Sequence, residues 1–306
     1  MTEATAAVPS KPPRVIRPTT PRAADGPAPL GSPFRAILRL TLYLGLTVTL
    51  IPVQAVAVAI GSGLAERLPV FYHRLCWRIL GLQVECRGTM STARPTLFVS
   101  NHSSYADITV LGGLIPGCFV AKAEVAAWPL FGLLAKLQRT VFIDRQRRST
   151  RNQRDDMAKR LEAGQNLILF PEGTSDDGNR LLPFRSALFS TAERRLDSGA
   201  ALPVQPVSIV YARLNGIPIG RGLRPFFAWY GDMELAGHLW CLAGLGKVTI
   251  VVEFHQPVSI DDTGSRKALA EYCQRAVADG MVRAITGRPL AGPAASAEVE
   301  VRAQVG

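Results

Sequence analysis

The sequence has few cysteines and few histidines, and neither residue type occurs in a spacing typical of metal ligands. A disulfide framework and a zinc site are not expected, and a reducing compartment fits best, because the cysteines are odd in number and form no CxxC pair. The four histidines form no HExxH or HxH pair, which argues against a metallohydrolase. The five cysteines are Cys76, Cys86, Cys118, Cys241 and Cys273.

The sequence also lacks a GxSxG motif, the turn that presents the nucleophile of many serine hydrolases. Its charge is unbalanced, because 35 lysines and arginines against 24 acidic residues give a net charge of +11. Such an excess favours anionic partners such as nucleic acid, phospholipid headgroups, phosphorylated substrates or an acidic carrier protein. Nucleic acid is disfavoured, since the basic residues are not interleaved with aromatic residues in a recognition motif.

Both ends of the chain contain little that a folded core is able to bury. Residues 1–33 are rich in alanine, proline and arginine, which predicts a disordered basic arm. Residues 286–306 are mostly small, which predicts a flexible tail.

The longest apolar run extends from Leu40 to Ala65 and contains no charged residue. A helix of this length is able to cross a hydrocarbon core of roughly 30 Å, although a buried core helix is the alternative. Basic residues precede the run, so a simple span would place the rest of the chain outside the cytoplasm. Pro52 is expected to interrupt the helix. We therefore predict that residues 34–82 form a membrane-embedded helical hairpin at the cytoplasmic face of the inner membrane, with a single span as the alternative.

Beyond residue 82, short apolar runs alternate with helical patterns, which is typical of an α/β sheet flanked by helices. We predict one such domain over residues 83–285. Open α/β sheets place their sites at the carboxyl ends of strands, so the polar loops after these strands are the candidate sites. The candidate strands cover residues 83–87, 96–100, 140–143, 167–170, 204–211 and 248–255, and helices are expected at 152–163 and 266–285.

The loop after the second candidate strand contains His102 and, five residues later, Asp107. On one continuous helix the two side chains would point about 140° apart. If a helix instead begins at Ser104, Asp107 lies in its first turn and is able to reach back to the imidazole. A carboxylate on one ring nitrogen leaves the other to take a proton from a hydroxyl, so the pair is a candidate general base with its partner. A plain helix cap with a surface histidine is the alternative.

Two further candidate strands run directly into charged loops. The sequence FIDR occupies residues 142–145, and FPEGT occupies residues 170–174. Loops of this kind are suited to place the cation of Arg145 and the carboxylate of Glu172 at one edge of the sheet. A surface ion pair and a simple turn are the alternatives.

Taken in this order, the segments resemble the glycerolipid acyltransferase family, which includes the 1-acyl-sn-glycerol-3-phosphate acyltransferases. The resemblance covers roughly residues 83–260 and implies a mixed sheet flanked by helices, as in glycerol-3-phosphate acyltransferases. The matching motifs are NHxxxxD (Asn101, His102 and Asp107), KxExxxxPxxG (Lys122, Glu124, Pro129 and Gly132), FIDR, FPEGT and a proline-containing strand at 202–207.

The resemblance implies direct O-acyl transfer from acyl-CoA or acyl carrier protein, without a cofactor and without a covalent acyl-enzyme. His102 would activate the acceptor hydroxyl, and Asp107 would orient His102. The partners would be a membrane lipid, a lysophospholipid acceptor and the acyl donor, and no nucleic acid. The implied substrate-binding residues are Lys122, Arg145, Glu172, Gly173, Thr174, Arg180 and Arg185.

The acceptor that the family most often uses is 1-acyl-sn-glycerol-3-phosphate, which gives phosphatidic acid in phospholipid biosynthesis. One departure weakens this expectation, because many members have Arg-Ser after FPEGT and this chain has Ser175-Asp176-Asp177. Residues 173–189 and the later WYGDM at 229–233 resemble a bacterial branch of lyso-ornithine lipid acyltransferases. An amine-bearing acceptor would tolerate the two acids, so lyso-ornithine lipid is the alternative acceptor. From a different class, a non-catalytic membrane lipid-binding protein stays open.

Overall fold

The computed structural model describes residues 30–143 and 150–287, with only the backbone for residues 150–155. Nearly all of the expected membrane and α/β segments lie within these ranges. Most of the expected basic arm (1–33), most of the expected tail (286–306) and Arg145 lie outside the described residues.

The first two helices form the predicted hairpin. Helix α1 extends over Pro33–Ala59 and α2 over Leu64–Ile79, and the two pack against each other across a short turn. Inside the hairpin the hydroxyl oxygens of Thr47 and Tyr72 are 2.9 Å apart. We expect from the sequence that Pro52 interrupts the first helix, but α1 continues through it. Proline removes one backbone hydrogen bond, and the turns on either side, which pack against α2, keep the helix continuous.

Helix α1 is apolar on its exposed side. In the described ranges it is the one helix long and apolar enough to cross a membrane, judged by length and composition. Only 17% of its most apolar window is buried against the rest of the chain. An apolar helix with so much exposed surface is a candidate membrane segment. Exposed large apolar side chains along it include Phe34, Leu42, Val48, Val53 and Val56.

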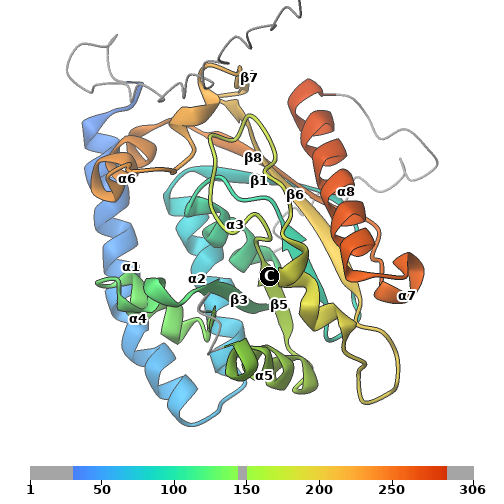
Figure 1. Ribbon diagram of the computed structural model, residues 1–306. Helices are drawn as coiled ribbons and strands as arrows, with labels where there is room; N and C mark the ends of the chain where they lie inside the picture. Colours follow the sequence, from blue (N-terminus) through green and yellow to red (C-terminus); the bar gives the residue numbers. More distant parts are fainter. Residues whose placement is uncertain (1–29, 144–149, 288–306) are drawn as a thin grey trace, which may run out of the picture. The chain divides into compact units, whose positions relative to one another are not determined.

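The sheet is mixed, with the strand order β1-β8-β6-β2-β5-β3-β4 and a short β7 beside β6 (Figure 1). The β6–β8 pair is antiparallel, whereas β1–β8, β2–β6, β2–β5, β3–β5 and β3–β4 are parallel. This confirms the predicted mixed α/β sheet. The strands are β1 (Leu82–Gly88), β2 (Leu97–Ser100), β3 (Gly117–Lys122), β4 (Val141–Ile143), β5 (Asn166–Leu169), β6 (Val204–Leu214), β7 (Ile217–Pro218) and β8 (Val248–Phe254).

The six predicted strands correspond to β1, β2, β4, β5, β6 and β8, and the two predicted helices to α5 (Thr150–Glu162) and α8 (Arg266–Thr286). The sequence does not predict β3, because its apolar residues follow those of α3 (Ala106–Leu114) with only a short break between them. The remaining helices are α4 (Phe131–Leu137), α6 (Leu235–Gly244), α7 (Ile260–Thr263) and the 3-10 turns η1 (Ala123–Ala127), η2 (Ser186–Glu193) and η3 (Arg224–Phe226).

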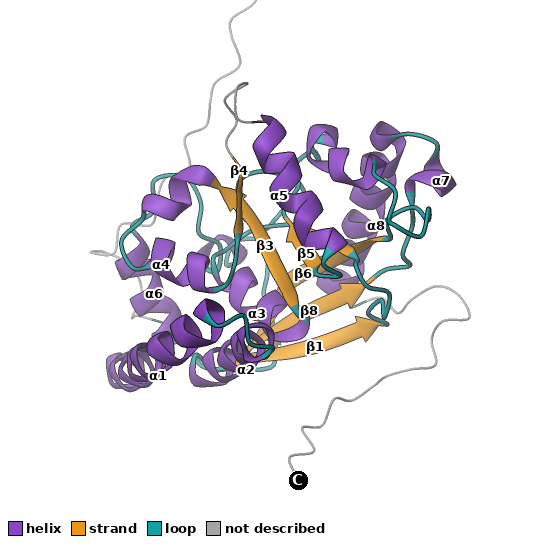
Figure 2. Cartoon of the chain, turned by 90° about the horizontal axis from the view of Figure 1, so that it is seen from below, coloured by secondary structure: helices purple, strands orange, loops and turns teal. Residues whose placement is uncertain are grey.

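Helices cover both faces of the sheet (Figure 2). Leu97 and Phe98 are neighbours in β2 and are both fully buried, on opposite faces. The face of Phe98 packs against α1, α3 and α6, and the face of Leu97 against α5, α8 and η2. Adjacent strand residues point to opposite faces, so a continuous apolar run is expected where both faces are covered.

Two arginines near the start of α1 connect the hairpin to the rest of the domain. Arg39 Nη1 donates to the carbonyl oxygens of Ala243 at 3.1 Å and Leu245 at 2.7 Å. Arg35 Nη1 donates to the carbonyl oxygen of Gly244 at 3.4 Å. These carbonyls end α6, where backbone acceptors lack helical partners and a cation complements the helix dipole. The hairpin is therefore held beside α6 on the α3 face of the sheet.

The topology brings the polar loops to one edge. Strands β2, β5 and β3 are adjacent and parallel, so their carboxyl ends lie together. His102 follows β2, Glu172 follows β5, and Lys122 ends β3. Residues that are far apart in the sequence thus meet at the edge where open α/β sheets place their sites.

Candidate active site

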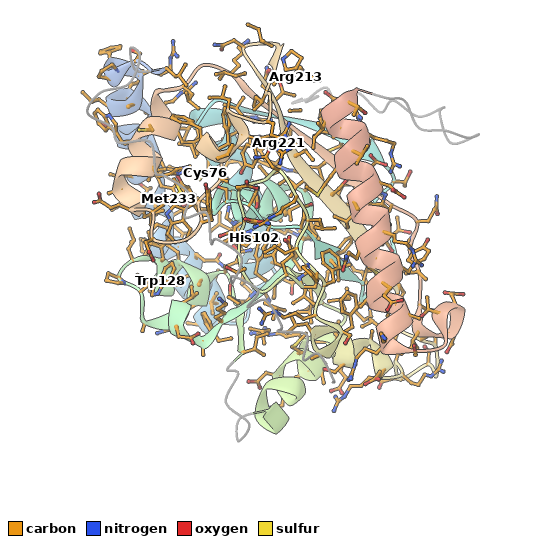
Figure 3. All side chains as sticks on the ribbon, turned by 45° about the horizontal axis from the view of Figure 1, so that its top comes forward. Cys76, His102, Trp128, Arg213, Arg221 and Met233 are labelled. Atoms are coloured by element: carbon orange, nitrogen blue, oxygen red, sulfur yellow. The ribbon has the colours of Figure 1, made fainter. Side chains whose placement is uncertain are left out.

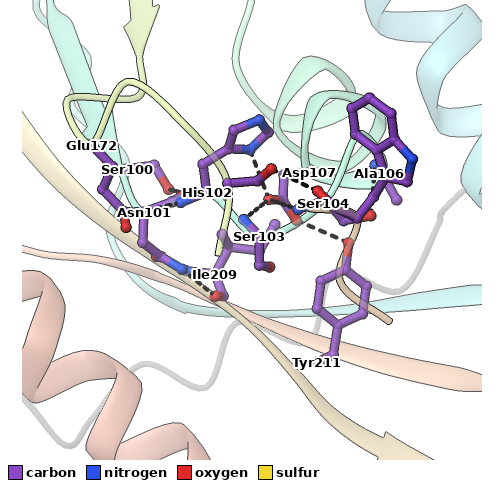
Figure 4. Close-up of polar contacts among 12 residues, drawn as sticks. Ser100, Asn101, His102, Ser103, Ser104, Ala106, Asp107, Glu172, Ile209 and Tyr211 are labelled. Carbon is purple, nitrogen blue, oxygen red and sulfur yellow. Dashed lines mark hydrogen bonds and ion pairs between the residues drawn. The ribbon is translucent and has the colours of Figure 1, made fainter. Parts of the chain in front are cut away.

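His102 lies in the loop between β2 and α3, and its ring contacts the carboxylate of Asp107 (Figure 4). The distance from His102 Nδ1 to Asp107 Oδ2 is 3.0 Å. The backbone N–H groups of Ser103 and Ser104 donate to the same oxygen at 2.7 and 2.9 Å. Because α3 begins at Ala106, Asp107 sits in its first turn and reaches back over the loop. The expected contact between imidazole and carboxylate is present.

The carboxylate determines which ring nitrogen of His102 carries the proton. Asp107 is completely buried and acts as an acceptor, so Nδ1 of His102 is the protonated nitrogen. Nε2 is then the nitrogen able to accept a proton. The ring stacks on Phe170, with centroids 4.1 Å apart and 17° between the planes, and its side chain stays 20% exposed. The stack fixes the plane of the imidazole while leaving it open to a ligand.

The second carboxylate oxygen of Asp107 has a partner from a different element. The hydroxyl of Tyr211, on β6, donates to Oδ1 at 2.9 Å. With His102 and the two backbone N–H groups, Asp107 takes part in four hydrogen bonds. A buried carboxylate needs such donors, because it has lost its hydration. The motif spacing does not indicate Tyr211, whose one signal in the sequence is a hydroxyl-bearing aromatic residue near the end of an apolar strand.

Glu172, the acid of FPEGT, lies beneath the His102 loop. Its Oε1 accepts from the backbone N–H of His102 at 2.7 Å, and its Oε2 accepts from the backbone N–H of Leu182 at 2.8 Å. Burial raises the pKa of Glu172 to about 7, the charges of Asp107 and Asp176 add to the rise, and the two backbone donors oppose it. The side chain is 3% exposed. Its contacts therefore support the loop, whereas the family resemblance implies a contact with the acceptor head.

Contacts of Asn101, Trp229 and Ser175 also hold the His102 loop in place. The Asn101 side chain donates to the carbonyl oxygen of Ile209 at 2.9 Å and accepts from its N–H at 2.8 Å. The backbone N–H of Trp229 donates to the carbonyl oxygen of Ser103 at 2.8 Å, and the Ser175 hydroxyl donates to the carbonyl oxygen of Trp229 at 2.6 Å. The loops after β2 and β5 and the WYGDM segment are thus joined around the imidazole.

The two acids after FPEGT are engaged within their own loop. Asp176 Oδ2 accepts from Arg180 Nε at 2.6 Å, and Asp177 Oδ1 accepts from the backbone N–H of Asn179 at 2.9 Å. Beneath them, the buried Arg224 donates from Nη1 to Asn179 Oδ1 at 2.9 Å. In the described ranges, no group of three or more His, Cys, Asp or Glu side chains is placed to hold a metal ion.

An apolar cavity of about 440 Å³ opens beside the imidazole, and both His102 and Trp128 line it (Figure 3). Its wall includes Ile51 and Leu68 from the hairpin and Phe131 from α4. A cavity walled by aliphatic and aromatic side chains is suited to a hydrocarbon chain. The hairpin therefore contributes to the site as well as presenting an apolar outer surface.

The other predicted binding residues fall into two groups. Gly173, Thr174 and Lys122 line the cavity together with His102. Arg180 has 72% of its side chain exposed and pairs with Asp176, and Arg185 is exposed; neither is among the residues that line the cavity. Arg145 lies outside the described residues.

Comparison with known proteins identifies similar sequences and similar folds. A protein-family model described as Acyltransferase matches residues 82–210. A lyso-ornithine lipid O-acyltransferase of Brucella abortus is 40% identical over 84% of this chain and 97% of its own length. An enzyme with the same name from Rhizobium meliloti is 36% identical over 81% of this chain and 86% of its own. A 1-acyl-sn-glycerol-3-phosphate acyltransferase of Neisseria gonorrhoeae is 33% identical over 59% and 67%.

The solved structure of the 1-acyl-sn-glycerophosphate acyltransferase PlsC from Thermotoga maritima has a similar fold. The TM-score is 0.55, with 20% identity over 85% of this chain and 99% of that chain. At this identity the likeness supports the fold alone.

Proposed function

This chain belongs to the acyltransferase family, and from that premise we propose that it transfers a fatty acyl group from an acyl thioester to the free hydroxyl of a lyso-ornithine lipid. Family membership makes the chain an acyltransferase of the lysolipid type. The proposal adds the acceptor, the residues that carry the reaction and the membrane surface at which it occurs.

The observation that carries the proposal is the His102–Asp107 pair at the rim of an apolar cavity. In the proposed reaction, His102 Nε2 takes the proton of the acceptor hydroxyl while the hydroxyl oxygen attacks the thioester carbonyl carbon. The new C–O bond forms, the C–S bond breaks, and the imidazolium returns its proton to the leaving thiolate. Asp107 stabilises the imidazolium through Nδ1.

Two observations favour a lyso-ornithine lipid as the acceptor. The relatives with that name match more of this chain, at higher identity, than the 1-acyl-sn-glycerol-3-phosphate acyltransferases. In addition, the loop after FPEGT carries Asp176 and Asp177 next to the residues that line the cavity. Asp176 is paired with Arg180, so Asp177 is the acid whose charge would repel a phosphate monoester and attract the amine of an ornithine head.

The second candidate acceptor is 1-acyl-sn-glycerol-3-phosphate, the acceptor that the resembling family most often uses. The supporting observation is Lys122, whose position among the cavity-lining residues would suit a phosphate. Thr174, also among them, offers a hydroxyl to either head. The two acceptors share the free hydroxyl, so the proposed chemistry at His102 is the same for both.

The proposed setting is the cytoplasmic face of the inner membrane. The exposed apolar side of α1 would enter one leaflet, and the cavity beside it would receive a chain from the bilayer. The donor would be acyl-CoA or an acyl carrier protein. The net charge of +11 suits both of these anionic donors and an anionic lipid surface.

A product assay tests the proposal. The detergent-solubilised protein is given a labelled palmitoyl donor with lyso-ornithine lipid or with 1-acyl-sn-glycerol-3-phosphate, and kcat/KM is compared. We expect preference for lyso-ornithine lipid, and we expect His102→Ala to lower turnover by roughly two to four decades while the circular dichroism spectrum stays unchanged. A higher kcat/KM for 1-acyl-sn-glycerol-3-phosphate would show that it, rather than lyso-ornithine lipid, is the acceptor. Full turnover by a folded His102→Ala protein would overturn the proposed mechanism.

A further inference from the structure

Strand β6 contacts both ends of the His102 loop. At the start of the loop, the side chain of Asn101 pairs with the backbone of Ile209. At the end of the loop, the hydroxyl of Tyr211 donates to Asp107 Oδ1 at 2.9 Å. Ile209 and Tyr211 are two residues apart in β6, so one short stretch of strand holds the residue before His102 and the carboxylate after it.

The position of Tyr211 in the strand directs its side chain to this carboxylate. Residues two apart point to the same face of a strand, and Ile209 and Tyr211 both lie in the core on the α3 face. An irregularity follows directly, because Arg213 rather than Ala212 continues the pairing with β8. The Tyr211 ring is 3% exposed and stacks on Phe227 with centroids 5.8 Å apart. The hydroxyl therefore has a fixed direction.

The hydroxyl of Tyr211 and the groups of the loop bind different oxygens of Asp107. Oδ2 contacts the His102 ring and the two backbone N–H groups, whereas Oδ1 accepts from Tyr211. Burial and the charge of Asp107 raise the pKa of Tyr211 well above its usual value, so the phenol stays a donor. A carboxylate with distinct partners on each oxygen resists rotation, since rotation would break several hydrogen bonds in a buried site.

We propose that Tyr211 is a positioning residue for acyl transfer, which acts through Asp107 to fix the direction in which His102 presents Nε2. The inference rests on the proposed role of His102 as general base. Tyr211 itself touches neither substrate nor reacting atoms in this scheme. Through Asp107 it connects the proposed base to β6, the strand beside β2, and this contact comes from outside the His102 loop.

Tyr211→Phe tests the inference because it removes one oxygen and keeps the ring. We expect kcat to fall roughly five- to fifty-fold, since a hydrogen bond to a buried charge is lost. We expect KM to stay unchanged, because the hydroxyl does not contact substrate. The acidic limb of the pH profile of kcat/KM should move to higher pH, since a carboxylate with one donor fewer holds a proton on the imidazole more strongly.

Tyr272→Phe is the matched control. Tyr272 is partly buried and packs against the core on the opposite face of the sheet, so the same atom is removed on the side away from Tyr211. The kcat of Tyr272→Phe and the acidic limb of its kcat/KM profile should equal those of the wild type. If Tyr211 has only a structural role, Tyr211→Phe should unfold at a lower temperature while the acidic limb of its kcat/KM profile stays where it is in the wild type. That result would overturn the inference.

A double-mutant cycle separates this inference from the proposed function. If Tyr211 acts through Asp107, Tyr211→Phe should cause no further loss in an Asp107→Asn background. Equal losses in both backgrounds would show that Tyr211 acts elsewhere. If His102→Ala loses turnover while Tyr211→Phe keeps the wild-type rate and pH profile, this inference alone fails. If His102→Ala keeps turnover, the proposed function fails first.

Discussion

The backbone N–H of His102 donates to Glu172 Oε1 at 2.7 Å, although 70 residues separate the two in the sequence. The other oxygen of Glu172 accepts from Leu182 at 2.8 Å, so the carboxylate bridges the loop after β2 and the segment after β5. Glu172 also carries a raised pKa of about 7, caused mainly by its burial. We infer that this acid affects activity through the backbone of the loop that carries the imidazole.

Glu172→Gln should therefore impair turnover without removing a substrate contact. The amide offers one acceptor oxygen, so the N–H of either His102 or Leu182 would face an NH₂ group and lose its partner. We expect a loss of about 1–3 kcal/mol in the free energy of unfolding and a fall in kcat of roughly ten- to a hundredfold. Chemical denaturation and the product assay measure the two effects.

Glu193→Gln is a suitable control for Glu172→Gln. Glu193 pairs with Arg266 at 3.3 Å on the surface, where 48% of its side chain is exposed. Its loss should change stability by no more than about 0.5 kcal/mol and leave kcat unchanged. A Glu172→Gln protein with wild-type kcat and a raised KM for the acceptor would instead support a direct contact with the acceptor head.

The contact between His102 and Asp107 was predictable because it is local. Five residues and a helix start determine whether the side chains meet, and the residue types indicate both features. The meeting of the β2 and β5 loops was also predictable in outline, since parallel strands align their carboxyl ends. Apolar runs bounded by polar loops located six of the strands within a few residues.

The supporting contacts of Tyr211 and Glu172 were not predictable in the same way. They depend on the strand order β6-β2-β5, which places β2 between two strands that lie far from it in the sequence. Apolar periodicity shows that a strand is buried and does not show which strand lies beside it. The motif therefore indicated Glu172, and the family resemblance implied a role in binding substrate, whereas its hydrogen bonds are to the backbone N–H groups of His102 and Leu182.

His255 should make stability depend on pH in the acid range. Its side chain is only 9% exposed, and its Nε2 lies 3.2 Å from Ser208 Oγ. Burial lowers its pKa to about 4, helped by the charge of Arg283 and opposed by Glu253 and Asp279. The unfolded state binds a proton near pH 6.5 and the folded state only near 4. Stability is thus retained above pH 6.5 and lost as pH falls from 6.5 to 4, by on the order of 3 kcal/mol.

His255→Gln tests this pH dependence. Glutamine does not titrate and is able to bond Ser208, so the difference in unfolding free energy between wild type and variant should shrink or reverse as pH falls from 6.5 to 4. Denaturant unfolding at several pH values measures this difference. A constant difference across the window would mean that His255 does not titrate differently in the folded and unfolded states.

The hairpin gives the last prediction, because its outer face has no partner in the described part of the chain. Val48 and Val56 on α1 are 67% and 60% exposed, within the helix that is long and apolar enough to cross a membrane. A charged residue near the centre of a membrane helix costs roughly 2.5–3.5 kcal/mol. Replacing both valines by aspartate should therefore lower partitioning into phosphatidylglycerol-containing vesicles by at least roughly a hundredfold.

A control variant with two aspartates on another helix distinguishes weaker membrane binding from a loss of folding. Val282 and Ile285 on α8 are 52% and 37% exposed and lie away from the hairpin. Aspartate at both of these positions should leave vesicle partitioning close to that of the wild type, because α8 covers the opposite face of the sheet. Equal partitioning of the wild type and both variants would contradict an anchor in α1. Full solubility of the wild type in buffer without detergent would contradict it too, because exposed valines on α1 are expected to be buried in lipid.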